Sequence, residues 1–147
     1  MTNDVLVSMS GIQFDGQQGT DAIEVINKGT YMKKDDMHYI AFEEVMEGFD
    51  QPTKNLLKFK DGYLSVTKRG VVNVNMEFEE NKKSLNFYAT PYGDIMMGID
   101  ATSVSFTEGE NHMQIKAKYT LEANYEFVAN CMVKIEVNSQ EKGISLV

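Results

Sequence analysis

The chain has 147 residues, 42% of them hydrophobic, and its 22 acidic and 14 basic side chains give a net charge of −8. This length suits one domain with its own core, and the negative charge opposes nucleic-acid phosphates and anionic membrane surfaces, so neither is an expected partner. The single cysteine, Cys131, excludes an intrachain disulfide, and no signal-like apolar segment opens the chain, so a cytoplasmic location is expected.

Alternating apolar and polar residues predict β-strands along most of the chain. Residues 4–14, 20–34, 38–47 and 53–60 form the first four expected strands, separated by turns that contain Gly or Asp. Gly29 interrupts the second strand, which is typical of a bulge or a bend. No segment with helical periodicity, sequence repeat or low-complexity tract is visible.

Turn signals then predict the register of the next hairpins. The dipeptide Asp61-Gly62 fits a two-residue turn. That turn sets three facing pairs, which are Phe59 with Leu64, Leu57 with Val66, and Asn55 with Lys68. A three-residue loop at residues 68–70 sets Leu64 opposite Val74, and a four-residue loop at residues 80–83 sets Val74 opposite Ala89.

Residues 84–99 indicate a further hairpin around the loop Pro91-Tyr92-Gly93. A three-residue loop would place apolar side chains in pairs on the core face: Ala89 with Ile95, Phe87 with Met97, and Leu85 with Ile99. The opposite, wet face would carry Asn86, Tyr88 and Thr90. Beyond Ile99 the apolar parity shifts, which predicts a bulge within residues 100–103.

These strands predict an all-β fold. Successive antiparallel neighbours without a covering helix favour a single antiparallel up-and-down β-barrel of about eight to ten strands, because closure removes the sheet edges. A two-sheet sandwich is the alternative. The barrel is expected to span residues 1–138, with residues 139–147 as a C-terminal tail.

Alternate loops of such a meander lie at the same end of the barrel, and that end defines the candidate site. Glu44 shares its phase with Ile40 and Phe42, and Asn55 and Lys68 prolong an apolar face, so a carboxylate and an ammonium approach across the barrel mouth. The alternative is an ion pair that only closes the barrel end. The candidate ligand-binding residues are Glu44, Asn55, Lys68, Arg69, Thr90, Tyr92 and Tyr119.

No motif in the sequence assigns a chemical reaction. The chain contains no nucleophile elbow, phosphate-binding loop, dinucleotide fingerprint or paired CxxC, so no catalytic residue and no cofactor are assigned. His38 and His112 fall at separate turns and, with one cysteine, give no metal-ligand set at usable spacing. Enzymatic activity is left open by the sequence but is not the expected function.

Five short motifs resemble, in order and spacing, a YwiB-like bacterial family of unknown function. They are FEE at 42–44, KRG at 68–70, MEF at 76–78, YATPYG at 88–93 and YTL at 119–121, and the likeness covers nearly the whole chain. The resemblance implies a small calycin- or lipocalin-type β-barrel, found mostly in Gram-positive bacteria. In that pattern an Arg usually begins the motif that here starts with Lys68, and a Tyr often replaces Phe42.

Two functions follow as hypotheses. The first is non-catalytic binding of a small, partly apolar ligand at the barrel mouth, since barrels of this size can hold one small ligand. The alternative is a protein-interaction module with a side-chain-filled barrel, which binds through its outer sheet face, around Asn73, Asn75 and Tyr88, or forms a homodimer.

Overall fold

A computed structural model of the chain describes residues 3–15, 18–19, 23–45 and 47–140, with residues 12–15, 18–19 and 23–24 described by their backbone alone. The strands in chain order are β1 (Asp4–Asp15), β2 (Gln18–Gly19), β3 (Ile23–Lys34), β4 (Met37–Val45), β5 (Pro52–Lys60), β6 (Tyr63–Arg69), β7 (Val74–Glu79), β8 (Lys82–Thr90), β9 (Gly93–Glu108), β10 (His112–Ala123) and β11 (Glu126–Ser139). The described residues contain no helix that is long and apolar enough to cross a membrane.

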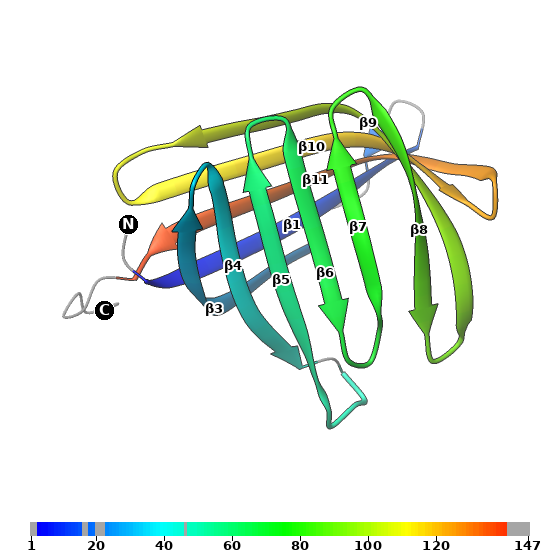
Figure 1. The fold of residues 1–147 in the computed structure, drawn as a ribbon. Helices are drawn as coiled ribbons and strands as arrows, with labels where there is room; N and C mark the ends of the chain where they lie inside the picture. The colour runs from blue at the N-terminus through cyan, green and yellow to red at the C-terminus, as the bar shows by residue number, and fades with distance from the viewer. Residues whose placement is uncertain (1–2, 16–17, 20–22, 46, 141–147) are drawn as a thin grey trace.

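The long strands curl into a nearly closed barrel (Figure 1). Their order is β7-β6-β5-β4-β3-β1-β11-β10-β9-β8, and the short β2 pairs with β1 outside this path. β11 returns to pair with β1 from Val5 and Ser139 to Phe14 and Asn130. The expected all-β fold, a single antiparallel barrel, is therefore confirmed. Of the expected tail, Gln140 donates its backbone N–H to the Asp4 carbonyl at 2.8 Å, and residues 141–147 lie outside the described residues.

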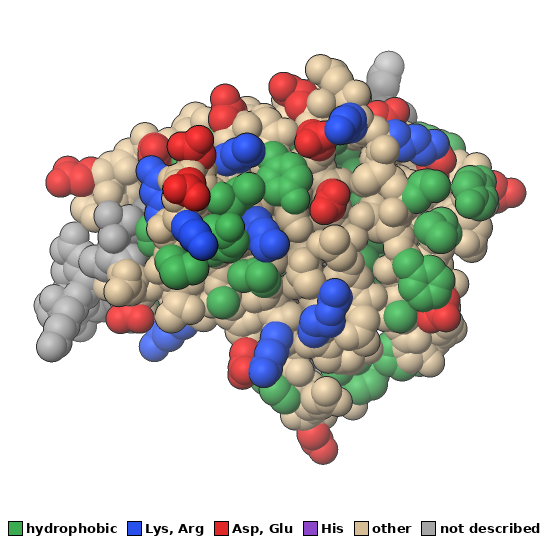
Figure 2. Space-filling view, in the orientation of Figure 1, with side chains coloured by type: hydrophobic (Ala, Val, Ile, Leu, Met, Phe, Trp, Pro, Cys, Tyr) green, Lys and Arg blue, Asp and Glu red, His purple; other side chains and the backbone are tan. Residues whose placement is uncertain are grey.

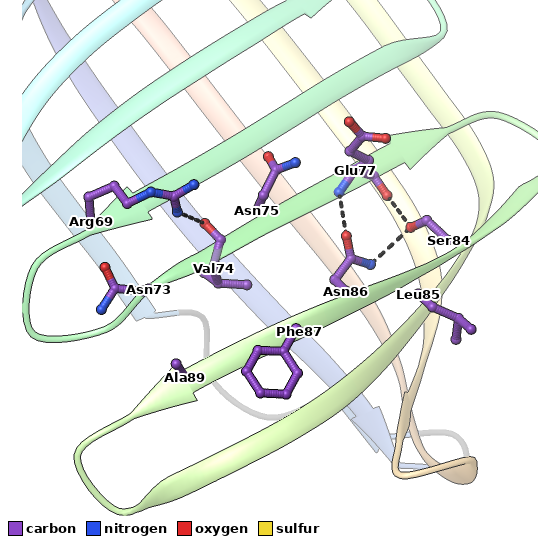
Figure 3. A pocket seen from close by; sticks show the side chains of 10 residues that line it. All are labelled: Arg69, Asn73, Val74, Asn75, Glu77, Ser84, Leu85, Asn86, Phe87 and Ala89. Atoms are coloured by element: carbon purple, nitrogen blue, oxygen red, sulfur yellow. Dashed lines mark hydrogen bonds between the residues drawn. The ribbon is translucent and has the colours of Figure 1, made fainter.

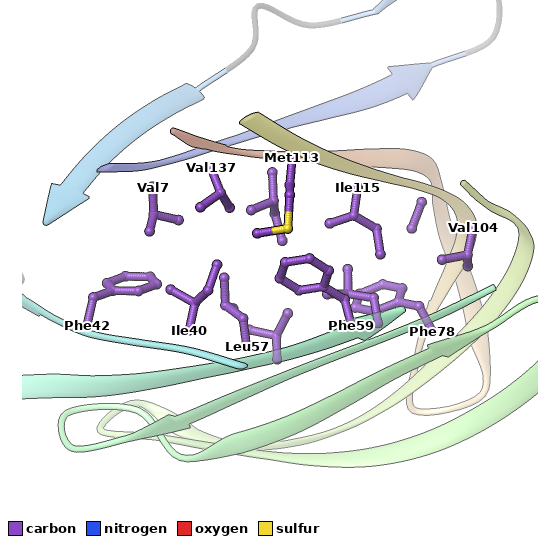
Figure 4. Packing of buried hydrophobic residues seen from close by; sticks show 14 of the residues in the cluster. Val7, Ile40, Phe42, Leu57, Phe59, Phe78, Val104, Met113, Ile115 and Val137 are labelled. Atoms are coloured by element: carbon purple, nitrogen blue, oxygen red, sulfur yellow. The ribbon is translucent and has the colours of Figure 1, made fainter. Parts of the chain in front are cut away.

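Alternating side chains fill the interior of the barrel. In Figure 4, Phe59 and Phe78 from one wall lie opposite Met113 and Ile115 from the other. Full burial of one such side chain stabilises a fold by about 1.5–3 kcal/mol. The largest fully buried side chains are Phe59, Phe78, Ile40, Leu57, Leu64, Ile99, Met113, Ile115, Ile135, Val5, Val7 and Val66.

The turn at Asp61-Gly62 has the predicted register. Phe59 lies opposite Leu64, and Asn55 opposite Lys68. Gly62 has a φ of 82°, which this two-residue turn requires and which a glycine adopts readily. The predicted bulge within residues 100–103 is also confirmed, because the pairing of β9 with β10 shifts between Lys118 and Tyr119.

The predicted register after Lys68 is wrong. Leu64 lies opposite Phe78, not Val74, because the loop between β6 and β7 is longer than three residues. The Asn73 side chain closes this loop, since its Oδ1 accepts from the Gly70 N–H and its Nδ2 donates to the Gly70 carbonyl, both at 3.2 Å.

The hairpin at residues 84–99 is also shifted by one residue from the prediction. Thr90 pairs with Gly93, so the loop has two residues. The Thr90 hydroxyl fixes this tighter turn, because it accepts from the Tyr92 N–H at 3.1 Å and donates to the Gly93 carbonyl at 2.7 Å. A one-residue slip exchanges the faces of a strand. Leu85 and Phe87 are therefore exposed on the outside, and Asn86 is buried.

The barrel wall is incomplete between β7 and β8, a stretch that we call the seam (Figure 3). Within the described residues one bridge, Asn73 with Ala89, replaces the predicted pairing of Val74 with Ala89. Farther along, Asn86 Oδ1 accepts from the Glu77 N–H at 3.3 Å and the Ser84 hydroxyl donates to the Glu77 carbonyl at 2.8 Å. These hydrogen bonds between side chains and backbone take the place of the backbone-to-backbone bonds of a β-ladder. A hollow of about 430 Å³ lies beside them.

Candidate functional site

A small pocket lies at the end of the packed interior, among β1, β3, β4, β6 and β11. We call it the mouth pocket, and its volume is about 190 Å³. Most of its wall is apolar or small, and Glu44 and Lys68 supply its two charges. The lining residues are Met9, Ser10, Gly11, Val25, Asn27, Phe42, Glu44, Lys68 and Val133.

Three predicted residues come together at this pocket. Phe42 and Lys68 each lie opposite Asn55, so neighbouring strands set their side chains side by side, and Glu44 points inward two residues after Phe42. Lys68 Nζ lies 2.6 Å from Glu44 Oε1, and Asn55 Nδ2 donates to the same oxygen at 3.0 Å. The Glu44 and Lys68 side chains are each 18% exposed, so the ion pair is largely shielded from water.

The charges at the mouth change the titration of Glu44 and Tyr88. Burial raises the pKa of the Glu44 carboxyl, but hydrogen bonds from Lys68 and Asn55 and the Lys68 charge outweigh it, so the net pKa is lowered. Burial raises the pKa of the Tyr88 phenol, and the Glu44 charge raises it further. Glu44 is therefore ionised at neutral pH, and Tyr88 is neutral.

Asn55 has spare hydrogen-bonding capacity in a buried position. The residue is 2% exposed, and its Nδ2 bonds to Glu44 and to the Thr53 carbonyl. Its Oδ1 is buried and, within the described residues, has no hydrogen-bond partner. An unpaired buried acceptor costs free energy. Asn55 itself does not line the mouth pocket, so it acts on the pocket through its bond to Glu44.

The remaining four predicted residues do not join this group. Arg69 points outward, where its guanidinium donates to the Lys68 and Val74 carbonyls. Thr90 bonds within its own turn, and Tyr92 is 90% exposed. Tyr119 lies deeper in the barrel, with its ring 4.9 Å from that of Phe78. Burial raises the pKa of the Tyr119 phenol, whose hydroxyl also shares a hydrogen bond with Cys131.

Sequence reasoning missed Tyr88 as an inward-facing residue. The three-residue loop predicted for its hairpin placed it on the outer face, whereas the observed register gives it the same face as buried Asn86. The signal that could have found it is Thr90, which stands immediately before the turn and whose hydroxyl can bond across it.

The fold and the pocket define a class of protein: a single antiparallel β-barrel with a packed interior and a small, largely apolar pocket at its mouth. Residues 7–135 match the family described as "Domain of unknown function (DUF1934)". The chain belongs to this family.

One solved structure similar to the chain is the crystal structure of the ywiB protein from Bacillus subtilis. The TM-score is 0.80 at 16% sequence identity, and the similarity covers 95% of this chain and 93% of that one. At this identity the similarity establishes the shared fold. The family match, together with this fold, confirms the YwiB-like family expected from the sequence motifs. A comparison with curated proteins gave no match.

Proposed function

We propose that the protein binds a small, partly apolar molecule in the mouth pocket without transforming it, and that it does so in the cytoplasm. The observation that carries this proposal is an ion pair with spare hydrogen-bonding capacity on the wall of a largely apolar pocket. Lys68 has N–H groups beyond the one directed at Glu44, and among the described residues the hydrogen bonds to Glu44 use Oε1 and leave Oε2 as an acceptor. Ligand sites commonly combine apolar walls with a few such groups, which orient the ligand.

The size of the pocket limits the ligand. The volume of about 190 Å³ lies below the roughly 300–1,000 Å³ of pockets that hold drug-sized ligands. The ligand is accordingly small, comparable to a short branched chain or a single ring with a polar end. The polar end faces Glu44 and Lys68, and the apolar body faces Met9, Phe42 and Val133.

Thermal melting tests the proposal. The purified protein is heated with a panel of short-chain fatty acids, isoprenoids, organic acids, amides, nucleotides and metal ions. A ligand at about one hundred times its dissociation constant stabilises the fold by about 2.7 kcal/mol, which raises the melting temperature of a domain this size by several degrees. A shift specific to one ligand class supports the proposal.

A pair of matched variants locates the bound ligand. Lys68→Met removes the charge from the mouth pocket, whereas Lys54→Met removes one from the exposed outer face of β5. The ligand-induced shift should be lost in Lys68→Met and kept in Lys54→Met. A panel without any shift would contradict the proposal and favour an ion pair that only closes the barrel end.

The outer surface supports a second candidate function, protein interaction, through apolar side chains beside the seam. Leu85 and Phe87 on β8 are 56% and 57% exposed, and Phe127 at the start of β11 is 64% exposed. Figure 2 shows hydrophobic side chains gathered on the side that carries β8, β9 and the hairpin between β10 and β11. Clustered exposed apolar side chains commonly mark an interaction surface.

A second copy of the chain is the first partner to test on this surface. The solution mass measured by light scattering should correspond to a dimer in the wild type and to a monomer in Phe87→Lys. A wild-type mass equal to one chain would remove the homodimer. Of the residues expected on the outer contact surface, Asn73 and Asn75 are exposed, whereas Tyr88 lies on the inner face.

A further inference from the structure

The Glu44–Lys68 pair presents a hydrogen-bond acceptor and a donor side by side at the pocket wall. Lys68 Nζ and Glu44 Oε1 are 2.6 Å apart. Within the part of the chain that the structure describes, both hydrogen bonds to Glu44 use Oε1, so Oε2 can accept another bond, and the ammonium retains further N–H groups. The pair as a whole has no net charge.

A neutral pair of this kind discriminates against ligands with one charge. A carboxylate would be attracted by Lys68 and repelled by Glu44. A protonated amine would be attracted by Glu44 and repelled by Lys68. Each would also lose its hydration in a pocket whose two charged side chains are only 18% exposed. The attraction and the repulsion largely cancel, while the desolvation cost remains.

An uncharged group with a donor and an acceptor on neighbouring positions avoids this cost. The nitrogen and oxygen of an amide are about 2.2 Å apart, from its C–N and C=O bond lengths, which is close to the separation of the Lys68 and Glu44 atoms. The amide N–H can donate to Glu44 while its oxygen accepts from Lys68. A zwitterionic amino acid has the same polarity, but both of its charges must be desolvated.

Resting on the proposed function above, we propose that the ligand of the mouth pocket ends in an amide, either a carboxamide or a lactam, on a short apolar body. The amide makes paired hydrogen bonds to Glu44 and Lys68. The body lies against Met9, Phe42 and Val133, and the 190 Å³ volume limits it to a few carbon atoms or one ring.

Four probes of similar shape test this inference by titration calorimetry: isocaproamide, isocaproate, isoamylamine and leucine. The wild type should bind the amide at least about tenfold more tightly than the acid or the amine, because a singly charged probe satisfies one partner and leaves the other unpaired. Leucine separates the zwitterion from the amide, and it should bind more weakly than isocaproamide.

Two variants should reverse the preference. Glu44→Gln leaves the Lys68 charge unbalanced, so this variant should gain affinity for isocaproate. Lys68→Met leaves the Glu44 charge, so this variant should gain affinity for isoamylamine. A gain of binding cannot arise from an unfolded variant, and Lys54→Met should keep the wild-type order.

The outcomes separate this inference from the broader proposal. Wild-type preference for isocaproate, isoamylamine or leucine would overturn the amide inference and leave the mouth pocket as a binding site. Failure of all four probes, while another class in the melting panel gives a shift that depends on Lys68, would overturn the amide inference alone. Failure of the probes together with a panel without shifts would overturn both.

Discussion

Replacing Lys68 with Met should destabilise the barrel by an amount that depends on pH. At neutral pH the Glu44 carboxylate would lose an ammonium 2.6 Å away and keep the bond from Asn55. Exposed ion pairs contribute up to about 1 kcal/mol, and removing one partner of a fully buried pair costs about 3–5 kcal/mol. With both side chains 18% exposed, we expect a loss of about 2 kcal/mol in the free energy of unfolding.

Acid should reduce this loss. In the wild type the net pKa of Glu44 is lowered, so its contribution to stability is present above the usual Glu pKa of about 4.3 and is lost as the pH falls through the lower, folded value. In Lys68→Met the burial of Glu44 remains without the cation, so its pKa rises and protonation relieves the penalty. The difference between the two proteins should therefore shrink on acidification.

Urea titration at about pH 7 and about pH 4 measures this difference. The chain has seven tyrosines and no tryptophan, so far-ultraviolet circular dichroism or tyrosine fluorescence provides the signal. Lys54→Met is the control, and it should change stability by less than about 0.5 kcal/mol at both pH values. An equally small effect of Lys68→Met at neutral pH, or a loss that does not diminish in acid, would refute this account of the pair.

Three further predictions concern positions outside the mouth pocket. Asn86→Ala should lower the free energy of unfolding by about 2 kcal/mol, measured in urea, because it removes the buried side chain that bonds across the seam. Gly70→Ala should cost more than about 1 kcal/mol, since Gly70 has a φ of 153° and an added Cβ would lie 2.8 Å from the Pro52 carbonyl oxygen, whereas the control Gly109→Ala should be nearly neutral. Burial lowers the pKa of His38 despite the opposing Glu108 charge, so the free energy of unfolding should fall as the pH drops below about 6.5. His38→Gln should flatten this pH dependence, and an unchanged pH dependence in the variant would contradict the prediction.

The fold could be predicted because its strongest signals are local. The Asp61-Gly62 turn requires a conformation that glycine adopts readily, so counting outward from it gave the correct partners of Phe59 and Asn55. The same register brought Asn55 beside Lys68, and the alternation of β4 directed Glu44 inward. The three residues that meet at the mouth were therefore within reach of sequence reasoning.

The errors arose where a side chain decides the length of a loop. Asn73 closes the loop after β6, and Thr90 tightens the turn after β8. Neither bond follows from the alternation of apolar residues. In β8 the alternation was misleading, because Leu85 and Phe87 are exposed while Asn86 is buried at the seam. The hydrophobic pattern of β8 therefore did not predict its buried face, whereas that of β7, on the other side of the seam, did, because Val74 and Phe78 are buried.

The pairing of β1 with β11 has a consequence for the order of folding. Val5 and Ser139 are 134 positions apart, whereas most other neighbouring strands are joined by short turns. Hairpins of that local kind form within about 1–10 μs, but the contact between β1 and β11 must first overcome the entropy of closing nearly the whole chain. We therefore expect two meanders, β3 to β7 and β8 to β11, to form early and to meet at β1 in the slow step. Destabilising substitutions at the β1–β11 contact should slow folding if this contact is already formed in the transition state. If it forms later, the same substitutions should mainly speed unfolding.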